Sequence, residues 1–110
     1  MKVAEYVEKG LKNLVEEKPE GYTEVGKCTS GCHSVSFFIK GSPEVVEDIR
    51  LKATKRCKKL LAVADLVADK IRERGRVYLD EEEVLGHFSE EKEQDKLRDR
   101  ISMVKTALGL

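Results

Sequence analysis

Two stretches of the chain alternate apolar and polar side chains with the two-residue period of a β-strand. Residues 35–39 place three apolar side chains on one face, and residues 49–53 alternate apolar with basic side chains. The connecting residues 41–44 are Gly, Ser, Pro and Glu, a composition typical of turns. The pattern therefore predicts two antiparallel strands that form a hairpin.

Most of the remaining chain has apolar residues at the 3.6-residue period of amphipathic helices. A first helix is expected from Val3 to Val15, before the helix-breaking Pro19. A second, strongly apolar helix should begin after Cys57 and end at Gly75, because glycine readily adopts the left-handed conformation that closes a helix. The apolar face of this second helix should pack on the sheet.

Two further helices are expected in the C-terminal part of the chain. Asp80 is a predicted N-cap, with Glu83 completing a capping box, for a short helix that ends near Phe88. Ser89 is the predicted cap of the last helix. The apolar stripe of this last helix consists of Leu97, Ile101, Val104 and Leu108.

The expected order of one helix, short strands and three helices indicates an α+β fold. We predict a small antiparallel sheet of about three strands with helices packed on one face. The 110 residues are enough for one hydrophobic core and too few for two, so residues 1–110 should form a single domain.

The composition indicates a cytoplasmic protein. No apolar run reaches the roughly 20 residues that span a membrane, and the charged start of the chain has no apolar signal core behind it. Charged residues make up 38% of the chain, and Asn13 and Gln94 are its only side-chain amides. This balance is typical of proteins from thermophiles.

The predicted hairpin brings two of the three cysteines together. Cys32 just precedes the first of its two strands and Cys57 just follows the second, at almost equal distances from the turn. In a reducing compartment such a pair favours metal binding or thiol chemistry over a disulfide. Cys28 is either a further ligand or a small buried apolar residue, and His33 is either a ligand or an exposed imidazole.

Cys57 lies within a basic stretch. Positions 50–59 contain six Lys or Arg residues and no acid. Lys55, Arg56 and Lys58 would favour the thiolate form of Cys57 and offer a docking surface to an acidic partner, or they only solvate the surface. We do not expect nucleic-acid binding, because no aromatic residues are interleaved with the cations and the chain as a whole is not basic.

The residues around the cysteines resemble those of a known family. Gly26–Ser34 leads into a strand, and Cys57 lies between a strand and the helix that contains Ala62–Val67. These segments resemble the IscU and NifU N-terminal family, the scaffold proteins on which iron–sulfur clusters are assembled. The resemblance covers most of the chain from Val25 onward, and it matches Cys32 and Cys57 to the first and second scaffold cysteines.

The chain departs from the family pattern at several positions. Ser34 replaces the family's aspartate, Arg98 its histidine and Asp99 its third cysteine, and the proline-containing segment that implies a dedicated chaperone is missing. The ligand set that the resemblance still implies consists of Cys28, Cys32 and Cys57 with either Asp99 or His33. Thiolates with a carboxylate or imidazole suit zinc, and thiolate-rich sets suit an iron–sulfur cluster.

The resemblance implies a scaffold or carrier rather than an enzyme. Such a protein would accept iron and sulfide, or sulfur from a cysteine desulfurase, and pass a transient cluster to apo iron–sulfur proteins. The alternatives are a zinc-stabilised interaction domain and a relative that keeps the fold without cluster chemistry. A further alternative is a thiol-dependent enzyme with Cys57 or Cys32 as nucleophile and His33 as base, but no oxyanion hole or substrate site is recognisable.

Overall fold

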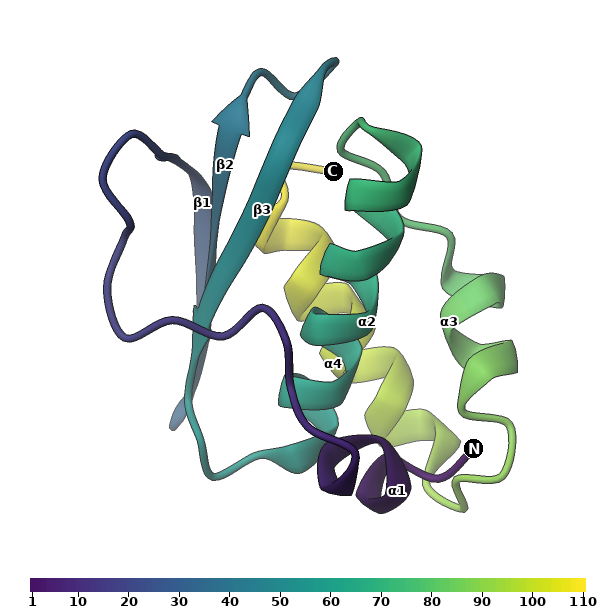
Figure 1. Cartoon of the computed structure of the whole chain (residues 1–110). Coiled ribbons are helices and arrows are strands. Elements are labelled where there is room, and N and C mark those ends of the chain that lie inside the picture. Colours follow the sequence, from purple (N-terminus) through teal and green to yellow (C-terminus); the bar gives the residue numbers. More distant parts are fainter.

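The computed structural model describes all residues from 1 to 110 and shows an α+β fold in which one layer of helices covers a small sheet (Figure 1). The α+β prediction with about three strands is confirmed. In chain order the elements are α1 (Val3–Glu8), β1 (Thr23–Ser30), β2 (His33–Gly41), β3 (Val46–Ala53), α2 (Lys58–Arg74), α3 (Glu81–His87) and α4 (Gln94–Ala107).

The sheet has the strand order β1-β2-β3, and both neighbouring pairs are antiparallel. The predicted hairpin is β2 and β3, with Phe37 opposite Leu51. The alternation of side chains did not identify β1, because this strand is largely exposed and is interrupted by a bulge between Glu24 and Gly26. Gly26 allows β1 to lie close to α4, since a Cβ atom there would be 2.5 Å from the Ala107 carbonyl oxygen.

Strands β1 and β2 are joined by a two-residue turn, Gly31 and Cys32, with Ser30 opposite His33. Gly31 has a φ of 60°, as the first central position of a type II′ hairpin turn requires. Cys32 is therefore exposed at the tip of this hairpin. This tip lies at the end of the sheet where β3 leads into α2, so Cys32 and Cys57 occupy the same end of the molecule, as predicted.

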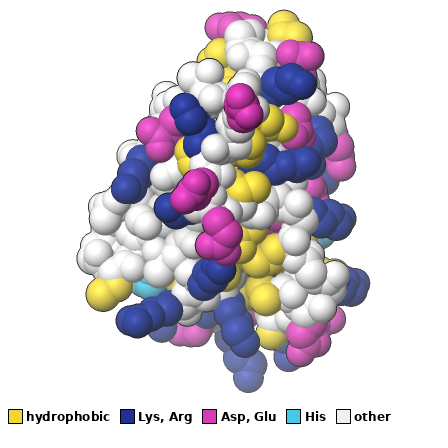
Figure 2. Space-filling model, turned by 60° about the vertical axis from the view of Figure 1, so that its left-hand side comes forward, with side chains coloured by type: hydrophobic (Ala, Val, Ile, Leu, Met, Phe, Trp, Pro, Cys, Tyr) yellow, Lys and Arg dark blue, Asp and Glu magenta, His cyan; other side chains and the backbone are white.

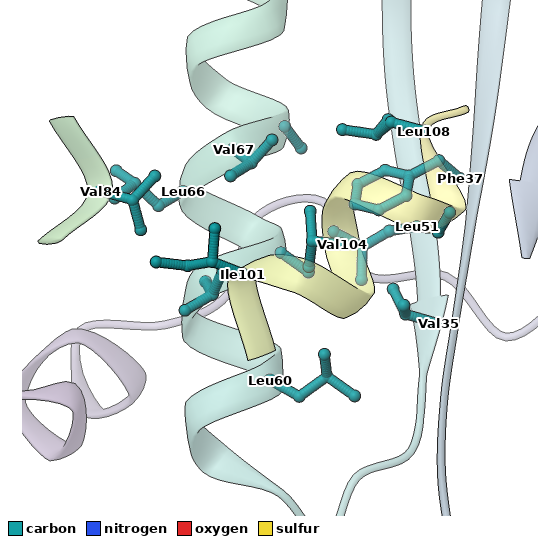
Figure 3. Packing of buried hydrophobic residues seen from close by; sticks show 14 of the residues in the cluster. Val35, Phe37, Leu51, Leu60, Leu66, Val67, Val84, Ile101, Val104 and Leu108 are labelled. Atoms are coloured by element: carbon teal, nitrogen blue, oxygen red, sulfur yellow. The ribbon is translucent and has the colours of Figure 1, made fainter. Parts of the chain in front are cut away.

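Helices α2 and α4 pack on one face of the sheet, which confirms the predicted layer of helices (Figure 1). Phe37 and Leu51 project from the sheet toward Val104 of α4 (Figure 3). Helix α2 is buried without interruption from Leu60 to Ala68, because it contacts β3 of the sheet as well as the other three helices. The core is thus continuous from β2 through α4 to α2.

Helix α1 is shorter than predicted, and the expectation of a helix to Val15 is wrong. The helix ends at Glu8, and Gly10 has a φ of 102°, which is incompatible with a right-handed helix. Leu14 instead forms a parallel bridge with Leu51 along the free edge of β3. The two neighbours of Leu14 in the chain make the hydrogen bonds of this bridge: Val15 N donates to Leu51 O at 2.8 Å, and Leu51 N donates to Asn13 O at 2.9 Å. Tertiary hydrogen bonds therefore override the helical periodicity in this segment.

The predicted helix ends were partly correct. Gly75 closes α2 in the left-handed conformation, and the Asp80 side chain accepts a hydrogen bond from Glu83 N at the start of α3. The prediction that Ser89 caps the last helix is wrong, because α4 begins only at Gln94.

None of the helices combines the length and the apolar character that a membrane crossing requires.

Candidate functional site

Cys57 is the N-cap residue of α2, at the strand-to-helix junction that the sequence predicted. Its Sγ accepts a hydrogen bond from Leu60 N at 3.4 Å, in the position that a serine or aspartate oxygen usually takes. The first turn of α2 contains no acidic residue. The positive end of the helix dipole therefore acts on the sulfur without a nearby compensating carboxylate on the same helix.

A second donor to Cys57 comes from α4. Arg100 Nε donates a hydrogen bond to Cys57 Sγ at 3.2 Å, and the Arg100 side chain is only 17% exposed. The hydrogen bond to Cys57 raises the pKa of the Arg100 guanidinium above its usual value, against the opposing effect of burial. The contact thus places a guanidinium directly against the sulfur.

The other two nitrogens of the same guanidinium contact two further candidate residues. Nη2 lies 3.4 Å from His33 Nε2, and Nη1 pairs with the carboxylate of Asp99. A guanidinium can only donate, so His33 Nε2 is the acceptor in this contact, and Nδ1 is the ring nitrogen that faces away from Arg100. That Nδ1 atom is buried and has no hydrogen-bond partner.

The alternation of β2 explains why His33 faces Arg100. His33, Val35 and Phe37 share one face of the strand, which is the face that the helices cover. Arg100 in turn lies on α4 between the buried Leu97 and Val104, so its side chain extends along the sheet and not into solvent. Packing of the core therefore places the imidazole and the guanidinium together.

Cys57, His33 and Arg100 line an open hollow of about 420 Å³. Lys59 in this hollow pairs with Glu91 at 3.6 Å and Glu93 at 3.1 Å, and Lys96 pairs with Glu93 at 2.7 Å. The remaining cations of the hollow, Arg56 and Lys58, form no ion pair. The hollow is therefore positively charged around the sulfur.

The surface view shows cationic side chains at one end of the molecule (Figure 2). Lys and Arg side chains project from the lower end of the molecule in Figure 2. This is the end at which β3 leads into α2 in Figure 1. Acidic side chains are interspersed among the cationic ones over the face that Figure 2 draws, the lower end included.

The three cations predicted to act on Cys57 lie at different distances from the hollow. Arg56 and Lys58 line it, but Lys55 instead reaches Glu16 at 2.7 Å, and this ion pair lowers the pKa of the Glu16 carboxyl. The group that contacts the sulfur is Arg100, which the sequence reasoning missed. No local signal could have identified it, because Arg100 and Cys57 are separated by 43 residues.

The other two cysteines do not line the hollow. Cys32 lies in the exposed turn directly before His33. Cys28 pairs with Val35 across the sheet, is half-buried and packs against the core.

The predicted ligands do not form a ready metal site. The structure contains no group of three or more His, Cys, Asp or Glu side chains spaced to hold a metal ion. Of the five predicted ligands, Cys57, His33 and Asp99 are brought together, and they meet around the Arg100 guanidinium. As placed, the site offers a half-buried thiol beside a guanidinium and an imidazole.

A second hollow of about 410 Å³ lies on the outer face of the sheet, under the segment that precedes β1. Its lining consists of hydroxyl, lysine and glutamate side chains with Phe38 and Ala53, and it contains no thiol or imidazole. Of these two hollows, the one at Cys57 alone contains a thiol and an imidazole.

No protein-family model matches this chain, and a search of curated proteins found no similar sequence.

Proposed function

We propose that this chain is an iron–sulfur assembly scaffold or carrier of the IscU and NifU type, with Cys57 as the thiol that receives the cargo. The observation that carries the proposal is the hydrogen bond from Arg100 to Cys57 Sγ at the N-terminus of α2, in an open and cationic hollow. A thiolate held in this way is both a nucleophile and a soft ligand. The resemblance around Cys32 and Cys57 supplies the class of cargo.

Transfer of sulfur to Cys57 needs only a persulfide donor, such as the persulfide of a cysteine desulfurase. The Cys57 thiolate attacks the outer sulfur of the donor persulfide, a new sulfur–sulfur bond forms, and the old one breaks. Its electron pair leaves on the donor thiolate, so no external oxidant or reductant is needed. The product on this chain is a Cys57 persulfide, which Arg100 continues to stabilise as an anion.

Cys32 is the second thiolate in this proposal. It lies at the same end of the sheet as Cys57, next to His33, and it is exposed in a turn. An exposed thiolate is suited to a cargo that must be handed on to an acceptor protein. Arg56 and Lys58, which have no ion-pair partner, would attract an acidic surface of the donor or acceptor.

A second candidate is a sulfur carrier that never holds a cluster. The position of Arg100 favours it, because a guanidinium already occupies the space between Cys57, His33 and Asp99. In this case the persulfide on Cys57 would itself be the cargo.

The test is the content of iron and acid-labile sulfide after anaerobic reconstitution of the wild type, Cys57→Ala and Cys32→Ala. Cys28→Ala is the matched control, because Cys28 packs against the core. A scaffold should bind iron with matching sulfide in the wild type and in Cys28→Ala, and should lose both in the other two variants. A sulfur carrier should show no iron, but intact mass should reveal one added sulfur atom at Cys57 after incubation with a persulfide donor. If neither appears, the proposed function is wrong.

A further inference from the structure

We propose that the Arg100 guanidinium acts as a built-in cation that keeps metal ions off Cys57, and that it thereby selects sulfur over metal as the first cargo of this site. The inference rests on the proposed function only in taking Cys57 as the working thiol. Arg100 is a positioning residue in this proposal, and the family resemblance assigns no role to it.

The contacts of the guanidinium carry the inference. Its three nitrogens each face a different candidate ligand: Nε contacts Cys57, Nη2 contacts His33, and Nη1 contacts Asp99. A thiolate, an imidazole nitrogen and a carboxylate are the donor types that bind Zn²⁺ in proteins. The lone pairs that would coordinate a metal ion are therefore directed at one organic cation.

The distances show why metal and guanidinium exclude each other. The Cys57 sulfur and the His33 nitrogen lie 3.2 and 3.4 Å from guanidinium nitrogens. Bonds to zinc are about 2.3 Å from sulfur and about 2.0 Å from nitrogen. Donors arranged around a planar guanidinium are thus spread too widely to share one ion. A metal ion could bind only after Arg100 had moved out and the donors had closed in.

The charges around the hollow act in the same direction. Arg56 and Lys58 line it without an ion-pair partner, and both would repel a divalent cation. Glu91 is the acid that lines the hollow, but its carboxylate already accepts a hydrogen bond from Val3 N at 3.0 Å and pairs with Lys59. A persulfide or a thiolate is anionic, so the same surroundings favour sulfur chemistry.

Arg100 can be replaced without removing the helix that carries it. The buried residues Leu97 and Ile101 anchor this part of α4 in the core. Arg98 on the same helix provides the matched control, because its side chain is 57% exposed and pairs with Glu81 at 3.4 Å, away from the thiol.

The experiment is a titration of the reduced full-length chain with Co²⁺, followed by competition with Zn²⁺. Thiolate-to-cobalt charge transfer in the near-ultraviolet reports whether the sulfur is a ligand. Arg100→Ala should bind Co²⁺ at least about tenfold more tightly than the wild type, because a like charge and a competing donor are removed. Arg98→Ala should behave as the wild type does. Arg100→Lys retains a cation and should still exclude the metal.

The gain in affinity must depend on the sulfur, so Arg100→Ala combined with Cys57→Ala should lose both the gain and the charge-transfer band. Equal Co²⁺ affinity in the wild type and Arg100→Ala would overturn the inference, as would a gain that persists without Cys57. If Arg100→Ala does not fold, as judged by circular dichroism, Arg100→Gln replaces it in the same titration.

This result is separable from the test of the proposed function. A gain of metal binding in Arg100→Ala, in a protein that takes up neither sulfur nor cluster, would support the role of Arg100 and reject the scaffold. Loading of the wild type with sulfur, without any gain of metal binding in Arg100→Ala, would support the carrier and reject the role of Arg100.

Discussion

Arg100 Nε donates a hydrogen bond of 3.2 Å to Cys57 Sγ, and the two residues belong to different helices and lie 43 positions apart in the chain. The thiol is therefore placed by the start of α2, and its partner is placed by the packing of α4 on the same core. Both helices must be docked before the pair can form.

Removal of the guanidinium should slow the reaction of Cys57 with iodoacetamide. The thiolate is the reactive form, and a hydrogen bond to a charged group is worth roughly 1.5 kcal/mol, so we expect about a tenfold lower rate at pH 7 in Arg100→Ala. The rate is measured by mass spectrometry of the modified peptide. Cys32, which is exposed and does not line the hollow, is the internal control. An equal change at Cys32 would contradict the explanation.

Asp65→Ala should strongly destabilise the fold. Asp65 is 1% exposed, and its carboxylate accepts hydrogen bonds from Tyr6 Oη at 2.8 Å and from the backbone nitrogens of Lys12 and Asn13 at 3.0 and 2.9 Å. Burial, followed by the hydrogen bond to Asp65, raises the pKa of Tyr6, so the phenol remains a donor. Loss of the acceptor leaves buried donors unsatisfied, and the free energy of unfolding should fall by about 3 kcal/mol.

Urea denaturation followed by circular dichroism measures this loss. Glu20→Ala, an exposed acid that forms no ion pair, is the charge-matched control and should change the stability by less than about 0.5 kcal/mol. If Asp65→Ala is as stable as that control, the Asp65 network does not hold the segment before β1.

Gly26→Ala should destabilise the contact between β1 and α4. The new Cβ would lie 2.5 Å from the carbonyl oxygen of Ala107, so a strand and a helix backbone must separate. Overpacking of this kind costs about 2 kcal/mol. Gly86→Ala is the control, because no atom lies within 4 Å of its Cβ position and alanine favours a helix. Thermal unfolding of both variants should give opposite shifts in Tm, and a stabilised Gly26→Ala would refute the close approach.

His87 should make the protein less stable in mild acid. Burial, followed by the nearby N-terminal ammonium, Lys70 and Lys9, lowers the pKa of His87 in the folded state. The unfolded chain, in which histidine has a pKa of about 6.5, therefore binds the proton more readily than the folded chain. The contribution of the neutral ring is fully present above this value and is lost as the pH falls below it and through the lower pKa of the folded state.

Comparison of urea denaturation at pH 7.5 and 5.5, values on either side of the histidine pKa of about 6.5, isolates this effect. His87→Phe keeps an aromatic ring against Tyr6 and Phe88, with which His87 forms edge-to-face contacts. The variant should lose less stability than the wild type over this interval. Equal losses in both proteins would assign the acid sensitivity to other groups.

Much of the fold could be predicted because its pattern is local. Strands β2 and β3 and helix α2 were identified by periodicity, and Gly75 and Asp80 end and begin helices as expected. The prediction of one helix over Val3–Val15 was wrong because backbone hydrogen bonds to Leu51 replace the helical ones in its second half. No local pattern reveals such bonds. Strand β1 escaped the pattern because most of its side chains are exposed.

The candidate site was only partly predictable. The positions of Cys32 and Cys57 at one end of the sheet follow from the symmetry of a hairpin about its turn, which the sequence displays. Arg100 depends on the packing of α4 against the sheet and α2, so its place beside the sulfur could not be deduced from its neighbours in the chain.

The two outer edges of the sheet differ in how they are protected. The bridge between Leu14 and Leu51 covers part of the β3 edge, and β1 carries a bulge together with the exposed charges of Glu24 and Lys27. An unprotected edge with a long regular row of backbone donors and acceptors invites strands from other molecules to add on. Both edges of this sheet are interrupted or charged in these ways, so we expect that the protein stays dispersed at high concentration instead of joining edge to edge into larger assemblies.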